Sequence, residues 1–316
     1  MSSLVEVKDL KKYFKSPRGI VHAVDGVSMK IEKGSTMGVV GESGCGKSTL
    51  GRVITQMISP TEGEILYDGN SIIGIKGNAL NKYHSQAQFI FQDPFSSLNP
   101  RYTVEQTIEE PLINERIYSK AEIERKTTEL MNMVGVAQRL RLSYPHELDG
   151  GRRQRIVIAR ALALNPKFIV CDEPVSALDV SIQAQILNLL QDLQEEKGLT
   201  YMFITHDMSV VRHISDNISV MYLGQLVETS PTEELFKNHY HPYTKALLSA
   251  IPSTDIHHKM KRIVLKGEIT SPINPKSGCR FAARCEYATD KCDQKQELEE
   301  VAPNHFVSCC RVHELN

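Results

Sequence analysis

Residues 36–50 read "TMGVVGESGCGKSTL", and this stretch decides which fold the rest of the chain can adopt. An apolar run typical of a buried strand ends at Val40, residues 41–48 fit the pattern G-x-x-x-x-G-K-[ST], and a helix is expected next. In such a unit the glycines let backbone N–H groups close around phosphates, and the helix N-terminus adds its positive dipole end. We therefore predict a nucleotide-phosphate site in which Lys47 reaches the β and γ phosphates and Ser48 is a ligand of Mg²⁺.

The bulk composition is that of an ordinary globular protein. The chain has 316 residues and a net charge of -1, so no global basic field favours nucleic acid as a partner. No run of apolar residues is long enough to span a bilayer, and the N-terminus lacks the apolar core of a signal peptide. We expect a cytoplasmic protein that can still dock on a membrane protein.

The order of predicted elements indicates an α/β fold. Residues 1–92 resemble short strands with turn signals, residues 93–165 are mostly helical, and residues 167–205 return to strand, helix and strand. Ser119 and Glu122 form a capping box that opens one of the helices. Near residue 240 prolines become frequent, which predicts a main domain over 1–240 and a C-terminal extension over 241–316.

Polar residues follow several predicted strands. Gln92 ends "QAQFIFQ", Asp172 and Glu173 end "FIVCDE", and His206 follows "YMFIT". In parallel sheets ligands gather at the carboxyl ends of strands, so these side chains are candidates for one site. We expect Asp172 to bind Mg²⁺ through water and Glu173 to act as general base toward an attacking water.

Taken together, these motifs resemble the ATP-binding subunits of ABC transporters, most closely those of dipeptide, oligopeptide and nickel import systems. "GESGCGKST" resembles the Walker A motif, "FIVCDEP" the Walker B motif and "SALD" the D-loop, while Gln92, His206 and Tyr13 match the Q-loop, the switch histidine and the adenine-stacking aromatic. "HPYTKALLSAIP" (residues 241–252), "SPINP" (residues 271–275) and the cysteine-rich tail fit the peptide-import branch.

The resemblance implies a P-loop NTPase of ABC type, with a mixed sheet core, an antiparallel β subdomain, a helical subdomain at about 93–165 and a small cysteine-rich extension. Catalysis would depend on Glu173, His206, Gln92 and Lys47, and Mg²⁺ would be held by Ser48, Gln92 and Asp172. Two subunits would sandwich two ATP molecules. The implied nucleotide contacts are Tyr13, Gly41, Ser43, Gly44, Cys45, Gly46, Lys47, Ser48, Thr49, Gln92, Asp172, Asp149, Gly150, Gly151 and Asp179.

The implied function is ATP hydrolysis that powers import of di- and oligopeptides from the cytoplasmic face of the membrane. The implied partners are a second ABC ATPase subunit in a heterodimer, two membrane permease subunits and, indirectly, an external solute-binding protein. Two alternatives stay open: an importer of nickel or another small solute, and a mainly regulatory ATP-binding subunit. An ABC ATPase acting on DNA or ribosomes is disfavoured, because the chain has neither a second cassette nor a basic patch.

The signature loop departs from the family pattern. The family usually has Leu-Ser-Gly-Gly-Gln, and this chain has "LDGGR" at residues 148–152. An ionised Asp149 can only accept hydrogen bonds, and at ~4 Å from a phosphate charge it would be repelled by about 4 kcal/mol at an effective dielectric of about 20. Two hypotheses follow. Either Asp149 caps the next helix and Arg152 offsets its charge, or the two ATP sites of a heterodimer are unequal.

Five cysteines lie close together in the last 40 residues. Cys279, Cys285, Cys292 and Cys309 have a spacing that matches no familiar zinc ribbon, yet four thiols can hold zinc or a [4Fe–4S] cluster. The resemblance favours the iron–sulfur cluster and matches Cys309 better than Cys310. Reduced structural thiols remain the alternative, and His305 and His313 remain substitute ligands.

Overall fold

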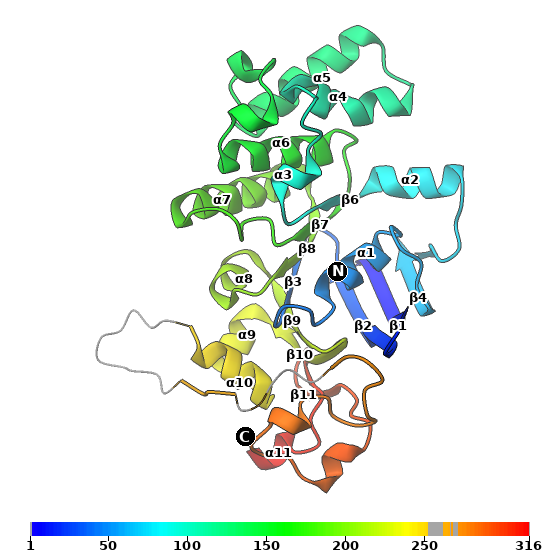
Figure 1. Ribbon diagram of the computed structural model, residues 1–316, viewed down its shortest axis with the longest axis vertical. Helices are drawn as coiled ribbons and strands as arrows, with labels where there is room; N and C mark the ends of the chain where they lie inside the picture. The colour runs from blue at the N-terminus through cyan, green and yellow to red at the C-terminus, as the bar shows by residue number, and fades with distance from the viewer. Residues whose placement is uncertain (1, 252–261, 266, 268–270, 316) are drawn as a thin grey trace. The chain divides into compact units, whose positions relative to one another are not determined.

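The computed structural model describes residues 2–251, 262–265, 267 and 271–315. The chain folds as two compact units. The first contains Met1–Gly74 and Phe203–Asn316, and the second contains Ile75–Met202, which is the cyan and green part of Figure 1. Strand β8 (Thr200–Thr205) is shared, because its first half belongs to the second unit and its last half to the first.

An antiparallel sheet opens the first unit. Its strands are β1 (Ser3–Ser16), β2 (Gly19–Glu32), β4 (Glu62–Tyr67) and β5 (Asn70–Ser71), in the order β2-β1-β4-β5. Buried Val5 and Val7 alternate with the more exposed Glu6 and Lys8, so the alternating sequence buries one face of β1.

The first unit also contains a mixed sheet. Strand β3 (Thr36–Val40) runs parallel to β9 (Asn217–Tyr222), whereas β9 and β10 (Gln225–Pro231) are antiparallel, as are β10 and β12 (His305–Val307) and β12 and β11 (Glu299–Ala302). Every residue of β3 is buried, which fits its apolar sequence. The unit's helices are α1 (Lys47–Ile54), α8 (Met208–Ile214), α9 (Thr232–Lys237), α10 (Pro242–Ser249) and α11 (Val312–Leu315).

The second unit is mainly helical. Parallel strands β6 (Ala87–Ile90) and β7 (Phe168–Asp172) lie beside helices that pack around α6, which contacts α3, α4, α5 and α7 (Figure 1). The helices are α2 (Asn78–Gln86), α3 (Pro94–Ser97), α4 (Val104–Glu115), α5 (Lys120–Met133), α6 (Gly150–Leu162) and α7 (Val180–Lys197).

The capping box predicted at Ser119 opens α5. The Ser119 hydroxyl accepts a hydrogen bond from the Glu122 amide at 3.4 Å, and the Glu122 carboxylate accepts one from the Ser119 amide at 2.8 Å. Three apolar residues near the end of the helix, Leu130, Met131 and the C-cap Val134, are buried. The periodicity of the sequence therefore locates the buried side of this helix.

The C-terminal segment, residues 271–315, packs against other elements of the first unit, to which it belongs. Residues 272–274, from "SPINP", pair antiparallel with the edge of β2: the His22 amide donates to the Pro272 carbonyl at 3.0 Å, and the Asn274 side-chain oxygen accepts from the Ile20 amide at 2.9 Å. A buried aromatic cluster made by Tyr222, Tyr243 and Phe281 joins β9, α10 and this segment, with ring centroids 4.8 to 5.3 Å apart.

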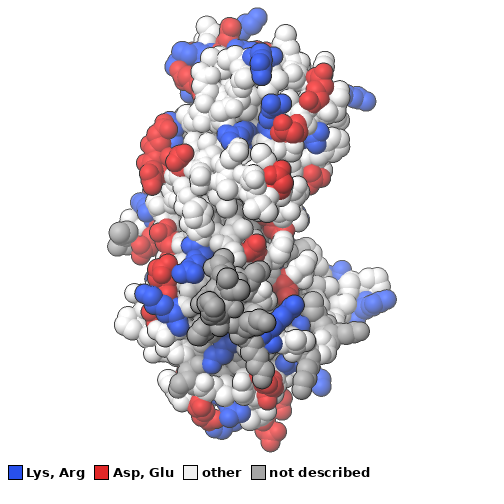
Figure 2. Space-filling model, turned by 90° about the vertical axis from the view of Figure 1, so that its left-hand side faces the viewer, with Lys and Arg blue, Asp and Glu red and all other residues white. Residues whose placement is uncertain are grey.

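The surface carries both signs of charge. On the face drawn in Figure 2, basic and acidic side chains are interspersed, in keeping with the net charge of -1. Among the described residues, no helix combines the length and the apolar character needed to cross a bilayer.

One buried histidine makes the stability of the first unit sensitive to acid. His241 is 1% exposed and caps α10, because its Nδ1 accepts the Tyr243 amide hydrogen at 3.1 Å. Burial lowers the pKa of His241 to about 4, and the charge of Glu228 opposes this only in part. Below pH 6.5 this histidine is protonated in the unfolded chain but stays neutral in the folded chain. The free energy of unfolding therefore falls by about 3 kcal/mol between pH 6.5 and 4.

We expect His241→Asn to remove most of that acid sensitivity, since Asn also caps helices but does not titrate. The free energy of unfolding should be measured in urea at pH 7, 6, 5 and 4 for both proteins. The two curves should converge toward low pH. Parallel curves would show that His241 is not the group responsible.

Candidate nucleotide site

The predicted phosphate loop, residues 41–48, connects β3 to α1 and depends on close backbone approaches. A Cβ atom on Gly41 would lie 2.1 Å from the Met221 carbonyl oxygen, and one on Gly46 would lie 2.0 Å from the Ala23 carbonyl oxygen. Gly46 also has a φ of +106°, a conformation that side chains disfavour. The tight curl of the loop therefore requires glycine at both positions.

Lys47 lies inside this curl. Its ammonium donates to the carbonyls of Gly41 at 2.7 Å and Glu42 at 3.0 Å, and the residue is only 5% exposed. Ser48 and Thr49 follow in the first turn of α1. Cys45, in the same loop, is buried, and burial raises the pKa of its thiol, which stays neutral. The loop thus presents one cation and a helix N-terminus, the combination that binds phosphate.

Glu42, which the motif leaves unspecified, is held by two residues of the C-terminal part of the chain. Its amide donates to the Tyr243 hydroxyl at 2.8 Å. Its carboxylate accepts two hydrogen bonds from Arg284, at 2.7 and 3.1 Å. No sequence signal reveals this pairing, because 242 positions separate the partners.

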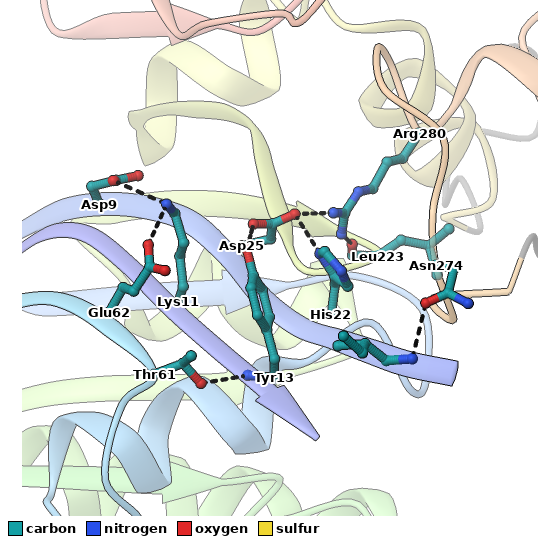
Figure 3. A network of polar contacts seen from close by, with 11 residues as sticks. Asp9, Lys11, Tyr13, His22, Asp25, Thr61, Glu62, Leu223, Asn274 and Arg280 are labelled. Atoms are coloured by element: carbon teal, nitrogen blue, oxygen red, sulfur yellow. Dashed lines mark hydrogen bonds and ion pairs between the residues drawn. The ribbon is translucent and has the colours of Figure 1, made fainter. Parts of the chain in front are cut away.

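Tyr13 belongs to a polar network in the first unit (Figure 3). Its hydroxyl donates to Asp25, whose other carboxylate oxygen contacts His22 at 3.1 Å and the guanidinium of Arg280. Burial alone would raise the pKa of Asp25, but hydrogen bonds from Tyr13 and His22 and the charge of Arg280 lower it. Asp25 is therefore ionised at neutral pH and fixes the position of the Tyr13 ring, which lies 4.1 Å from the His22 ring.

In the second unit, Gln92 and Glu173 meet at the carboxyl ends of parallel strands β6 and β7. The Gln92 side-chain amide donates to the Glu173 carboxylate at 2.9 Å, and buried Asp172 precedes it at the end of β7. Glu173 has a φ of +47°, a sparsely populated conformation for a residue with a side chain. The structure therefore brings two of the four strand-end candidates, Gln92 and Glu173, into contact.

Asp149 caps α6, as its residue type predicts. Its carboxylate accepts the Arg152 amide hydrogen at 2.8 Å, and the Arg152 guanidinium lies 3.4 Å from its other oxygen. Both side chains are at least half exposed, so solvent screens this ion pair and it offsets the charge of Asp149 only weakly.

The signature glycines pack on the predicted D-loop within the same unit. A Cβ on Gly150 would lie 3.0 Å from Leu178, and one on Gly151 would lie 2.7 Å from Ile182. Asp179 caps α7 by accepting the Ile182 amide hydrogen at 3.0 Å. The signature loop and D-loop therefore form one packed element.

His206 is exposed and follows β8 in the first unit.

The cysteine tail does not form a ready metal site. Cys279, Cys285, Cys292 and Cys309 line one pocket, while exposed Cys310 has its sulfur 3.8 Å from that of Cys292. Within the described ranges, no group of three or more His, Cys, Asp or Glu side chains is arranged to hold a metal ion. Burial raises the pKa of Cys279 to about 12, and neighbouring thiols add to the shift. The Cys279 thiol is therefore neutral at pH 7, and the predicted zinc or iron–sulfur site lacks structural support.

Comparison with known sequences identifies relatives along the whole chain. The family described as ABC transporter matches residues 24–176, and the family described as oligopeptide/dipeptide transporter, C-terminal region, matches residues 227–292. The oligopeptide transport ATP-binding protein AppF of Bacillus subtilis is 51% identical, covering 97% of each chain. The dipeptide transport ATP-binding protein DppF of Haemophilus influenzae is 47% identical, covering 98% of this chain and 97% of that one.

Solved structures support the fold. A post-hydrolysis dimer of the ATP-binding cassette MJ0796 bound to ADP and Pi is similar with a TM-score of 0.66 and 32% identity, over 72% of this chain and 98% of that chain. The cbiO1 protein of Clostridium perfringens, part of the ABC transporter complex cbiONQ, is similar with a TM-score of 0.68 and 28% identity, over 75% and 92% of the two chains.

A comparison of Gly44 with Gly46 tests whether the close approach of a backbone carbonyl is what requires glycine in the phosphate loop. Gly46→Ala must displace the Ala23 backbone, whereas Gly44→Ala meets nothing within 4 Å and adds only the strain of its φ of +77°. We expect Gly44→Ala to cost about 1 kcal/mol of unfolding free energy and Gly46→Ala at least ~2 kcal/mol more. Urea unfolding of both variants checks this, and equal losses would contradict it.

Proposed function

The chain belongs to the ABC transporter family, within the group of oligopeptide and dipeptide transport ATP-binding proteins, and on this premise we propose that it hydrolyses ATP to power peptide import. The observation that carries the proposal is the Gln92–Glu173 contact at the end of β7, beside buried Asp172. Such a pair can position and polarise water, which is the main protein contribution to phosphoryl transfer. The similarity to a cassette bound to ADP and Pi supports the same chemistry.

The phosphate loop binds the nucleotide's phosphates. Lys47 exchanges its two carbonyl contacts for phosphate oxygens, and backbone amides of Gly41, Ser43, Gly44, Cys45 and Gly46 supply further donors. Ser48 and Thr49 contribute hydroxyls in the first turn of α1. The Tyr13 ring, whose position is fixed by the hydrogen bond to Asp25, stacks on the adenine base.

Ser48, Gln92 and Asp172 would hold Mg²⁺, since hydroxyl, amide and carboxylate oxygens suit that ion. When bound, Mg²⁺ neutralises charge on the phosphates. Glu173 takes the proton of the attacking water, with Gln92 steadying its carboxylate. His206 contacts the γ phosphate, and Asp179, next to the signature glycines, relays the state of one subunit to the other.

The general-base role is tested by Glu173→Gln, which keeps the hydrogen-bonding shape but removes the base. We expect ATP turnover at this chain's own site, measured separately from turnover at the partner's site, to fall about 10²- to 10⁴-fold while ATP binding persists. Glu195→Gln, on the exposed face of α7 in the same unit, is the matched control and should keep full turnover. Undiminished turnover in Glu173→Gln would exclude Glu173 as the base.

The partners follow from the family. We propose that the chain pairs with a second ATPase subunit, a heterodimer in this reading, and docks on two membrane permease subunits at the cytoplasmic face. An external solute-binding protein delivers the peptide. The names of the relatives favour peptides over nickel as the imported solute.

The weak Asp149–Arg152 pairing supports unequal ATP sites. Each signature loop faces the nucleotide held by the other subunit, so Asp149 acts on the partner's ATP. Because its charge is only weakly offset, it repels the phosphates there and slows turnover at the partner's site.

This asymmetry is tested in a Glu173→Gln background, where only the partner's site turns over. Asp149→Ser should raise the remaining ATPase activity about tenfold, since ~1.4 kcal/mol of relieved repulsion has that effect. Asp149→Asn keeps the helix cap and removes the charge, so it should give a similar rise. Unchanged activity in both variants would favour equal sites.

We also propose that Cys279, Cys285, Cys292 and Cys309 bind a [4Fe–4S] cluster. All four line one pocket, and each thiolate of a cluster binds a different iron, so they stand farther apart than the ligands of one zinc ion. Binding of the irons would require the four thiols to release their protons to solvent, so that the sulfurs ligate as thiolates.

Anaerobically purified protein should absorb visible light as iron–sulfur proteins do, with about four irons per chain. Cys292→Ser should lose the absorption, and Cys310→Ser should keep it. Colourless protein with stoichiometric zinc would contradict the proposed cluster. Loss of the visible absorption in Cys310→Ser would show that Cys310, and not Cys309, is the fourth ligand.

A further inference from the structure

Arg284 makes the most specific contact between the C-terminal segment and the phosphate loop. Both of its terminal nitrogens donate to the Glu42 carboxylate, at 2.7 and 3.1 Å, and its side chain is only 8% exposed. A guanidinium that engages both oxygens of a carboxylate fixes the direction of that side chain as well as its charge. Glu42 is therefore turned toward the C-terminal segment.

The surroundings hold Arg284 in place. Its guanidinium lies 6.0 Å from the centre of the Tyr222 ring, and Tyr222 packs on Phe281 and Tyr243. Tyr243 also accepts the Glu42 amide hydrogen. Both the backbone and the side chain of this loop residue are thus anchored to one aromatic cluster.

The loop needs this arrangement because Glu42 is an anion beside the cation that binds phosphate. The Lys47 ammonium already contacts the Glu42 carbonyl at 3.0 Å, so a released Glu42 carboxylate would be within reach of it. A carboxylate paired with Lys47 would compete with phosphate oxygens for the same charge.

Arg280, four residues earlier, anchors a second element of the first unit. It contacts the Asp25 carboxylate and the Leu223 carbonyl, and its side chain is 5% exposed (Figure 3). The C-terminal segment therefore contacts the phosphate loop through one arginine and the Tyr13 network through another.

We propose that Arg284 is a positioning residue for nucleotide binding. Arg284 keeps the Glu42 carboxylate away from Lys47 and neutralises the charge of that carboxylate. The proposal rests on the proposed function, in that the ligand of the loop is ATP. It gives the C-terminal segment a role in ATP affinity in addition to any role in binding a metal cluster.

The test is a double-mutant cycle on the full chain, with ATP and ADP titrated by calorimetry. Arg284→Gln should weaken ATP binding about tenfold and ADP binding less, because the freed Glu42 charge repels the more highly charged nucleotide more strongly. Glu42→Gln should bind ATP at least as tightly as wild type. The double variant should return to within about threefold of Glu42→Gln, since no carboxylate is left to compete.

The matched control is Lys295→Gln, which removes an exposed cation of the same segment and should leave ATP affinity unchanged. Thermal melts confirm that each variant is folded. Folded Arg284→Gln with wild-type affinity would overturn the proposal, and so would a double variant as weak as Arg284→Gln, because the arginine would then act independently of Glu42. Wild-type protein that fails to bind ATP would instead overturn the proposed function.

Discussion

The close approach of backbone carbonyls to Gly41 and Gly46 is the constraint on which the site depends. Carbonyls of Met221 and Ala23 occupy the space that a Cβ atom would need. These two contacts hold the loop after β3 against β9 and β2, and the loop curls tightly enough to enclose the Lys47 ammonium. The loop's affinity for phosphate therefore arises from packing in the first unit as much as from the motif itself.

Local patterns in the sequence predict the parts of the protein that local physics determines. The buried strand before residue 41, the capping box at Ser119 and the helix cap at Asp149 all follow from hydrophobic periodicity or side-chain chemistry within a few residues. The meeting of Gln92 with Glu173 follows from the rule that parallel strands end at the same edge of a sheet.

Long-range contacts are the part that sequence patterns could not supply. The Glu42–Arg284 and Asp25–Arg280 pairs join residues more than 200 positions apart, and nothing in one sequence links a variable loop position to a distant arginine. In the cysteine tail, by contrast, the sequence does contain a pattern, but the pattern does not determine the geometry. Its spacing suggests a metal site, but spacing does not specify whether the thiols approach closely enough to share an ion, and those described here do not.

The central claim is that ATP hydrolysis by this chain powers peptide import, and transport by the complete complex tests it most directly. The chain, its partner ATPase and the permeases would be reconstituted in vesicles, and uptake of a labelled peptide delivered by the binding protein would be measured. ATP should drive accumulation, and a non-hydrolysable analogue should not. Equal uptake with both nucleotides, or with Lys47→Ala in place of the native chain, would contradict the account.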